Sequence, residues 1–216
     1  MFAAASLTEA FNASSSQVPQ VRPTFSFAGS QQLVTQLIQG AAADVVATAD
    51  EATMQRLLAA DLVDPPVTFA HSSLVIAVRP GNPKGVTGLA DLARPGLAVV
   101  LADRSVPAGR YAGQVLDGAG VAVAPRSLEL DVKAALAKVT AGDADAAIVY
   151  ATDVRASGGR ADAVAFPEAA APAAQVAYRI AVTRATTHRP AAEAFAAAAA
   201  TAGPVRDALL TAGFTA

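Results

Sequence analysis

The sequence predicts an α/β fold made of two lobes, each a mainly parallel sheet flanked by helices. Short strand-like apolar runs alternate along the chain with stretches that have the apolar spacing of helices. Two seams rich in proline interrupt this alternation, at residues 79–83 and 167–172. A chain of 216 residues can form one large domain or two lobes of about 100 residues each. The seams favour two lobes, with the middle segment inserted into the first lobe.

Seven segments have the pattern of strands, at residues 2–5, 24–28, 44–49, 74–78, 97–102, 146–150 and 177–183. Helices are predicted between them, for example around Leu33 and around Leu57. Glycine is expected just past the end of a helix, as at Gly142, and proline in its first turn, as at Pro107. We therefore predict one lobe from residues 1–77 with 180–216 and a second from residues 78–179. Strand segments near residues 75–78 and 178–182 would join them.

Composition excludes several classes of protein. Hydrophobic residues make up 53% of the chain and charged residues 16%, which is typical of a globular protein. No apolar run approaches the roughly 18 residues that a membrane-spanning helix needs. The 16 Lys and Arg are scattered and the net charge is -2, which argues against nucleic-acid binding. The first residues lack the basic and long apolar regions of a secretion leader, so we expect a chain without its leader.

Motifs for catalysis are absent from the sequence. It contains no cysteine and only two histidines, His71 and His188, neither with the spacing of metal ligands. G-x-S-x-G, G-x-G-x-x-G and the phosphate-binding loop motif are also missing. The acidic residues near strand ends or in loops, Asp44, Asp50, Asp103 and Asp153, are interpreted as helix caps or solvated groups. Asp131, directly before a predicted helix, is interpreted as its cap. We expect a binding protein that is not an enzyme and has no cofactor.

An ordered set of short motifs carries a family resemblance through nearly the whole chain. The motifs are FAAASLT at residues 2–8, FAGS at 27–30, ADV at 43–45, VPAG at 106–109, DVK at 131–133, IVY at 148–150 and AGFT at 212–215. In sequence and order they resemble the periplasmic molybdate-binding receptors of bacterial ABC importers. The resemblance implies a type II periplasmic-binding-protein-like fold with the ligand in the cleft between the lobes.

The resemblance also implies a set of ligand-binding residues. Family members hold the oxyanion through two serine hydroxyls, a tyrosine hydroxyl and main-chain N–H groups; the matching positions are Ser6, Ser30, Ala108, Val132 and Tyr150. Molybdenum would be bound only as its oxyanion through these residues, with no direct bond from protein to metal. The sequence departs from the family at Gly29, where a serine is common, and in a first strand that begins at Met1.

The residue types give an independent reason for this choice. Ser6, Ser30, Ala108 and Val132 are each predicted at the start of a helix; Ser6 has capping-box spacing to Glu9. Free N–H groups at helix starts bind anions without lysine or arginine. Taken singly, however, the two serines have the commoner role of helix caps, and Tyr150 that of a core ring.

A site made only of donors suits an anion that carries no proton. A protonated phosphate would leave its own proton unpaired, at a cost of about 1–3 kcal/mol. Sulfate differs from molybdate only in size, and tungstate is nearly the same size as molybdate. We therefore predict a monomeric receptor that binds molybdate and tungstate and delivers them to the membrane permease of an ABC transporter.

The expected location is extracytoplasmic, in the periplasm or at the cell surface, with or without a lipid anchor. Two alternatives stay open. One is an anion-sensing effector domain of a transcription regulator, since the same fold serves that purpose. The other is a receptor for another oxyanion such as sulfate.

Overall fold

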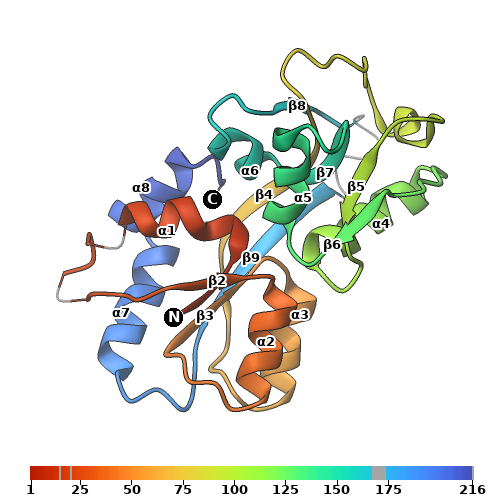
Figure 1. Cartoon of the computed structure of the whole chain (residues 1–216). Helices are drawn as coiled ribbons and strands as arrows, with labels where there is room; N and C mark the ends of the chain where they lie inside the picture. Colours follow the sequence, from red (N-terminus) through yellow and green to blue (C-terminus); the bar gives the residue numbers. More distant parts are fainter. Residues whose placement is uncertain (15, 20, 167–173, 216) are drawn as a thin grey trace. The chain divides into compact units, whose positions relative to one another are not determined.

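The chain forms two compact α/β units, each with its own sheet (Figure 1). The computed structural model describes residues 1–14, 16–19, 21–166 and 174–215, so the predicted seam at 167–172 lies outside the described residues. Unit 1 comprises Met1–His71 and Ala177–Ala216, and unit 2 comprises Ser72–Val176. Both boundaries fall inside strands, β4 (Val67–Val78) and β9 (Gln175–Val182). The lobe boundaries predicted from the sequence fall a few residues further along the same two strands.

The sheet of unit 1 has the strand order β2-β1-β3-β9. Strand β1 is parallel to both β2 and β3, whereas β9 is antiparallel to β3. The elements of this unit, besides the ends of β4 and β9 that belong to it, are β1 (Phe2–Ala4), the 3-10 turn η1 (Ala5–Leu7), α1 (Thr8–Ser14), β2 (Ser26–Ala28), α2 (Ser30–Ile38), β3 (Val45–Thr48), α3 (Glu51–Ala59), α7 (Arg189–Ala200) and α8 (Pro204–Thr211).

Apolar side chains bury both faces of this sheet. Val34 of α2, Leu57 of α3 and Val46 of β3 belong to one buried cluster. Phe11 of α1 packs edge-to-face on Phe195 of α7, with ring centroids 5.4 Å apart. Figure 1 shows α7 across the sheet from α2 and α3. The sheet is therefore covered by helices on both sides, as the α/β prediction requires.

Unit 2 has a sheet in which β7, β5 and β6 lie side by side and run parallel. The C-terminal part of β4, Leu74–Val78, pairs antiparallel with β7 and, from Ile76 on, with β8. The elements are β5 (Val99–Ala102), the 3-10 helix η2 (Leu89–Ala93), α4 (Pro107–Gly118), β6 (Ser127–Glu129), α5 (Val132–Ala141), β7 (Ala146–Tyr150), α6 (Ala151–Ala156) and β8 (Asp162–Val164). All five residues of β7 are buried, which makes it the centre of this unit's core.

Local chemistry sets the ends of the helices that matter for the site. Pro107 occupies the first position of α4. The Asp131 carboxylate accepts a hydrogen bond from the N–H of Ala134 (2.8 Å) and caps the start of α5. Gly142 ends α5 with φ 85°, a left-handed conformation that favours glycine. These three features were predicted from the sequence and are confirmed.

The mainly parallel sheets that the sequence predicts also contain antiparallel strands. Of the two strands that cross the unit boundaries, β9 runs antiparallel to β3 and β4 runs antiparallel to β7. Strands β6 and β8 were not predicted, since each has three residues and no fully buried position from which a period could be recognised. Among the described residues, no helix is long and apolar enough to cross a membrane.

Candidate functional site

Ser6 and Ser30 lie at the same edge of the unit 1 sheet. Strands β1 and β2 are neighbours and parallel, with Ala4 opposite Ala28 in the register. Each serine follows its strand by two residues, Ser6 within η1 and Ser30 at the first position of α2. Both are buried, at 4% and 1% exposure. Two serines that are 24 positions apart in sequence are thus brought together at the carboxyl edge, where open α/β sheets bind their ligands.

Ser6 has a partner that the sequence did not suggest. Its Oγ lies 2.9 Å from the hydroxyl of Tyr178, on β9. The 3-10 turn η1 lies between β1 and α1, which begins at Thr8, and the Thr8 hydroxyl donates to the Ala5 carbonyl (2.6 Å) across this turn. Ser6 is therefore inside a turn, with its hydroxyl directed to another strand of the same sheet.

The hydroxyl of Ser30 makes a hydrogen bond with the main chain. Its Oγ accepts a hydrogen bond from the N–H of Ala49 (3.1 Å), just after β3. The cap position of α2 is Gly29, whose N–H donates to Oε1 of Gln32 (3.2 Å). Gly29 is the position where the sequence departs from the family pattern, and its main-chain N–H is already hydrogen-bonded to the Gln32 side chain of the same helix.

The other three predicted positions lie at one edge of the unit 2 sheet. Ala108 is the second residue of α4, which follows β5, and Val132 is the first residue of α5, which follows β6. Tyr150 ends β7 and immediately precedes α6. Because β7, β5 and β6 are adjacent and parallel, their carboxyl ends meet at a single edge. All three residues are buried, with exposures between 1% and 4%.

The main-chain N–H groups of Ala108 and Val132 are suited to an anion by their place in the helix. The first four N–H groups of an α-helix have no acceptor within the helix, and the helix dipole adds partial positive charge there. Gly109, the third residue of α4, packs against the end of β5. A Cβ on Gly109 would lie 2.6 Å from the carbonyl carbon of Asp103 and closer still to the carbonyl oxygens of Ala102 and Asp103. The glycine of the VPAG motif thus allows the helix start to approach the strand end.

One ion pair lies beside these donors. The ammonium of Lys133, in the first turn of α5, is 3.7 Å from the Asp153 carboxylate of α6. The Asp153 side chain is fully buried, so its interpretation as a cap or solvated group is wrong; the cap position of α6 is occupied by Tyr150. Helix α6 packs against α5, which turns its third residue inward. A buried carboxylate is tolerated when a cation is paired with it.

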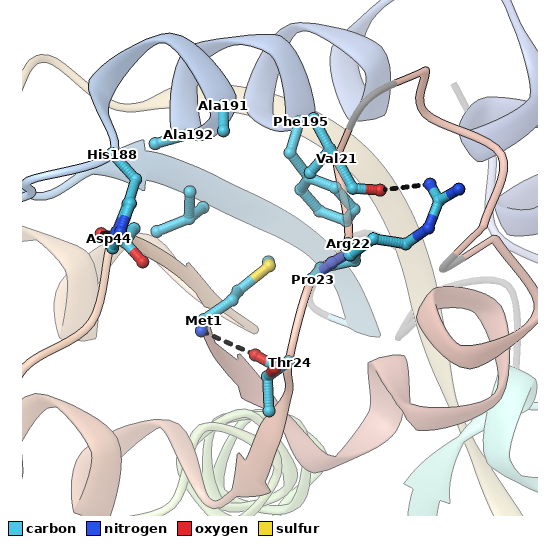
Figure 2. A pocket seen from close by; sticks show the side chains of 11 residues that line it. Met1, Val21, Arg22, Pro23, Thr24, Asp44, His188, Ala191, Ala192 and Phe195 are labelled. Atoms are coloured by element: carbon cyan, nitrogen blue, oxygen red, sulfur yellow. Dashed lines mark hydrogen bonds and ion pairs between the residues drawn. The ribbon is translucent and has the colours of Figure 1, made fainter.

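A separate cavity of about 320 Å³ lies in unit 1 (Figure 2). Met1, Thr24 and Asp44, which line it, all precede strands, so the cavity is at the edge of the sheet opposite Ser6 and Ser30. Asp44 accepts hydrogen bonds from the Thr186 hydroxyl (2.6 Å), which lowers the carboxyl pKa, and lies 3.2 Å from Nδ1 of His188, which lowers it further. Among the described residues, no three His, Cys, Asp or Glu side chains are grouped as a metal site requires.

The fold and the placement of these residues define a solute-binding protein. Over residues 1–215 the chain matches the family described as bacterial extracellular solute-binding protein, and it belongs to that family. This is a class of binding proteins, not of enzymes.

The relatives within this family are more specific. The chain is 45% identical over 175 residues to a molybdate-binding protein of Mycobacterium tuberculosis, covering 79% of this chain and 67% of that protein. It is 33% identical over 182 residues to a molybdate-binding protein of Escherichia coli, covering 78% and 71%.

Solved structures share the fold. The periplasmic molybdate-binding protein of Azotobacter vinelandii superposes with a TM-score of 0.81 at 19% identity, covering 100% of this chain and 98% of that one. The sulfate-binding protein SubI of Mycobacterium tuberculosis gives a TM-score of 0.80 at 24% identity, covering 99% and 84%. Each of these likenesses shows the α/β fold of periplasmic binding proteins.

Proposed function

We propose that this protein is the extracytoplasmic receptor of an ABC importer, binds molybdate and delivers it to the membrane permease. The observation that carries the proposal is the placement of the predicted ligand residues. In each unit they lie together at the carboxyl edge of parallel strands, and four of the five stand in the first two positions of an α-helix or immediately before one. The 45% identity to proteins named for molybdate binding supports the choice of ligand.

The proposed site consists of Ser6, Ser30, Ala108, Val132 and Tyr150 and performs no chemistry on its ligand. Three hydroxyls and two main-chain N–H groups would donate to the four oxygens of a dianion that has no proton to give. Neutral donors at helix starts compensate the charge through their dipoles, so lysine and arginine need not touch the ion.

Binding would be coupled to movement of the two lobes, residues 1–77 with 180–216 and residues 78–179. With donors divided between the lobes, the anion stabilises the closed form by bridging them. The permease would then recognise the closed form of a monomeric receptor. The two strands that cross the unit boundaries, β4 and β9, would act as the hinge.

Selectivity follows from protonation and size. Phosphate near neutral pH carries a proton that a donor-only site leaves unpaired, so it should bind weakly. Tungstate has nearly the size and charge of molybdate and should bind with similar affinity. Sulfate has the same charge but shorter bonds, so only the size of the site can separate it from molybdate, and we expect it to bind less tightly.

Isothermal titration calorimetry with the four anions tests the proposal. We expect one molybdate or tungstate per chain, weaker binding of sulfate and the weakest binding of phosphate. In a parallel thermal unfolding experiment, molybdate at 100 times its Kd should stabilise the protein by about 2.7 kcal/mol. For a chain of this length that raises the midpoint by about 5–11 °C.

Phosphate binding as tight as molybdate binding would contradict the donor-only site. Tighter binding of sulfate than of molybdate would favour the sulfate receptor instead. Size-exclusion chromatography with light scattering, with and without molybdate, checks the monomer.

A further inference from the structure

The hydroxyl of Tyr178 is buried and in hydrogen-bond contact with that of Ser6. The two oxygens are 2.9 Å apart, and the residues are 0% and 4% exposed. Both belong to unit 1, Ser6 in the turn after β1 and Tyr178 on β9. They are separated by 172 positions in the sequence, so only the fold brings them together.

Aromatic packing fixes the position of the Tyr178 ring. Phe214 meets it edge-to-face with centroids 5.1 Å apart and planes at 89°. Phe69 meets it in the same way at 6.3 Å and 82°. Edge-to-face pairs of this kind stabilise a defined ring orientation. The phenol oxygen is therefore held in place independently of Ser6.

The direction of the Ser6–Tyr178 hydrogen bond follows from counting protons. A serine hydroxyl has one proton to donate and two lone pairs that accept. A fully deprotonated oxyanion has only hydrogen-bond acceptors, so a Ser6 hydroxyl that contacts the anion must donate its single proton to it. The contact with Tyr178 can then persist only if the phenol donates and Ser6 Oγ accepts.

We propose that Tyr178 is a positioning residue of the anion site: it donates its proton to Ser6 Oγ and so directs the Ser6 proton to the ligand. The proposal rests on the proposed function, because it needs Ser6 to contact the anion. It deepens that function by assigning a role to a residue that does not itself touch the ligand.

Ser30 has the same arrangement with a donor of another kind. Its Oγ accepts from the N–H of Ala49 at 3.1 Å, and a main-chain N–H can only donate. The proton of Ser30 is therefore available to the ligand. Ser6 and Ser30 thus each accept a hydrogen bond from a buried donor, the Tyr178 hydroxyl for Ser6 and a main-chain N–H for Ser30, which leaves their own protons for the ligand.

This arrangement affects selectivity as well as affinity. With one lone pair occupied and its proton directed to the ligand, Ser6 is a poor acceptor for the proton of hydrogen phosphate. Without the phenol, the Ser6 hydroxyl can rotate and accept that proton. Loss of the Tyr178 hydroxyl should therefore weaken molybdate binding and narrow the preference for molybdate over phosphate.

The test is the Tyr178→Phe variant, which keeps the ring between Phe69 and Phe214. Titration with sodium molybdate should show an affinity lower on the order of tenfold, as for loss of one hydrogen bond near a charged group. The ratio of molybdate to phosphate affinity, measured by competition, should fall. In a Ser6→Ala background the same change should alter molybdate affinity by less than about twofold, because the phenol acts only through Ser6.

Thr183→Val is the matched control. Thr183 follows β9, is 2% exposed and donates its hydroxyl to the Ala43 carbonyl, at the opposite end of this strand segment from Tyr178. The Thr183→Val substitution removes a buried hydroxyl from the same unit, so it should lower stability without changing the ratio of molybdate to phosphate affinity.

The outcomes separate the two proposals. If the unaltered protein binds no molybdate, both the proposed function and the role of Tyr178 are overturned. If it binds molybdate but Tyr178→Phe binds with unchanged affinity and ratio, only the role of Tyr178 fails. An equal loss in the presence and absence of the Ser6 hydroxyl would likewise show that the phenol acts through some other group.

Discussion

Gly109 provides the sharpest test of how the fold presents a main-chain donor. It follows Ala108 in the first turn of α4, and an added Cβ would lie 2.6 Å from the Asp103 carbonyl carbon, with the carbonyl oxygens of Ala102 and Asp103 closer still. Real Cβ atoms essentially never come within 3.0 Å of such atoms. Glycine is required here by space, because the strand end is main chain and has no flexible side chain that can move aside.

The size of the effect follows from the displacement. In Gly109→Ala the helix start must move by at least 0.8 Å, the difference between 2.6 Å and ordinary contact at 3.4 Å. Overpacking of this kind costs about 1–3 kcal/mol of stability, and two main-chain oxygens place this site at the upper end. For this chain length, about 3 kcal/mol lowers the unfolding midpoint by about 6–12 °C. The N–H of Ala108 moves with the helix, so molybdate affinity should also fall about tenfold or more.

Gly113, one turn further along α4, is the matched control. A Cβ there would meet the guanidinium carbon of Arg104 at 2.9 Å, which is the far end of a flexible side chain. Arg104 pairs with Asp117 at 3.2 Å, but both side chains are more than half exposed, so the pair contributes little. Replacing glycine by alanine inside a helix gains up to about 1 kcal/mol. Gly113→Ala should therefore keep or raise stability and leave molybdate binding unchanged.

Thermal unfolding followed by circular dichroism and calorimetric titration measure both variants. If Gly109→Ala unfolds within about 2 °C of the unaltered protein, the close approach of α4 to β5 is not a constraint. If it is destabilised but binds molybdate with unchanged affinity, the Ala108 N–H is not a ligand of the anion.

Three further predictions concern the serine, a helix cap and acid stability. Ser30→Ala should weaken molybdate binding by about 1–3 kcal/mol and also lower stability by leaving the buried Ala49 N–H without its acceptor; unchanged affinity by calorimetry would remove Ser30 from the site. Asp131→Ala should cost about 1 kcal/mol through loss of the α5 cap, seen as a midpoint lower by about 2–4 °C, whereas Asp131→Asn should retain most of the stability. The Thr186 hydroxyl lowers the pKa of Asp44. The hydrogen-bonded Asp44 carboxylate therefore contributes stability that is present above the ordinary carboxyl pKa and is lost as pH falls through the lowered value. Thr186→Val should raise that pKa and shift acid unfolding to higher pH; an unshifted acid midpoint would contradict this.

Much of the local structure was determined by the sequence itself. The order of strands and helices, the start of α4 at Pro107 and the cap of α5 at Asp131 follow from apolar period, proline geometry and side-chain hydrogen bonds over three or four residues. The motif residues Ser6 and Tyr150 could be singled out only because each belongs to the ordered set of short motifs that resembles the periplasmic molybdate-binding receptors. These features depend on near neighbours in the chain, which the sequence displays directly.

Contacts between distant segments were decided only by the tertiary structure. The strand orders β2-β1-β3-β9 and β7-β5-β6 determine which strand ends meet, and no local pattern encodes them. The same is true of the pairing of Ser6 with Tyr178 and of the burial of Asp153 against Lys133. A tyrosine in an apolar strand and an aspartate near a helix start have the same local pattern whether they serve a site or not. Their roles depend on what packs against them, because burial and long-range hydrogen bonds arise only when the sheets assemble.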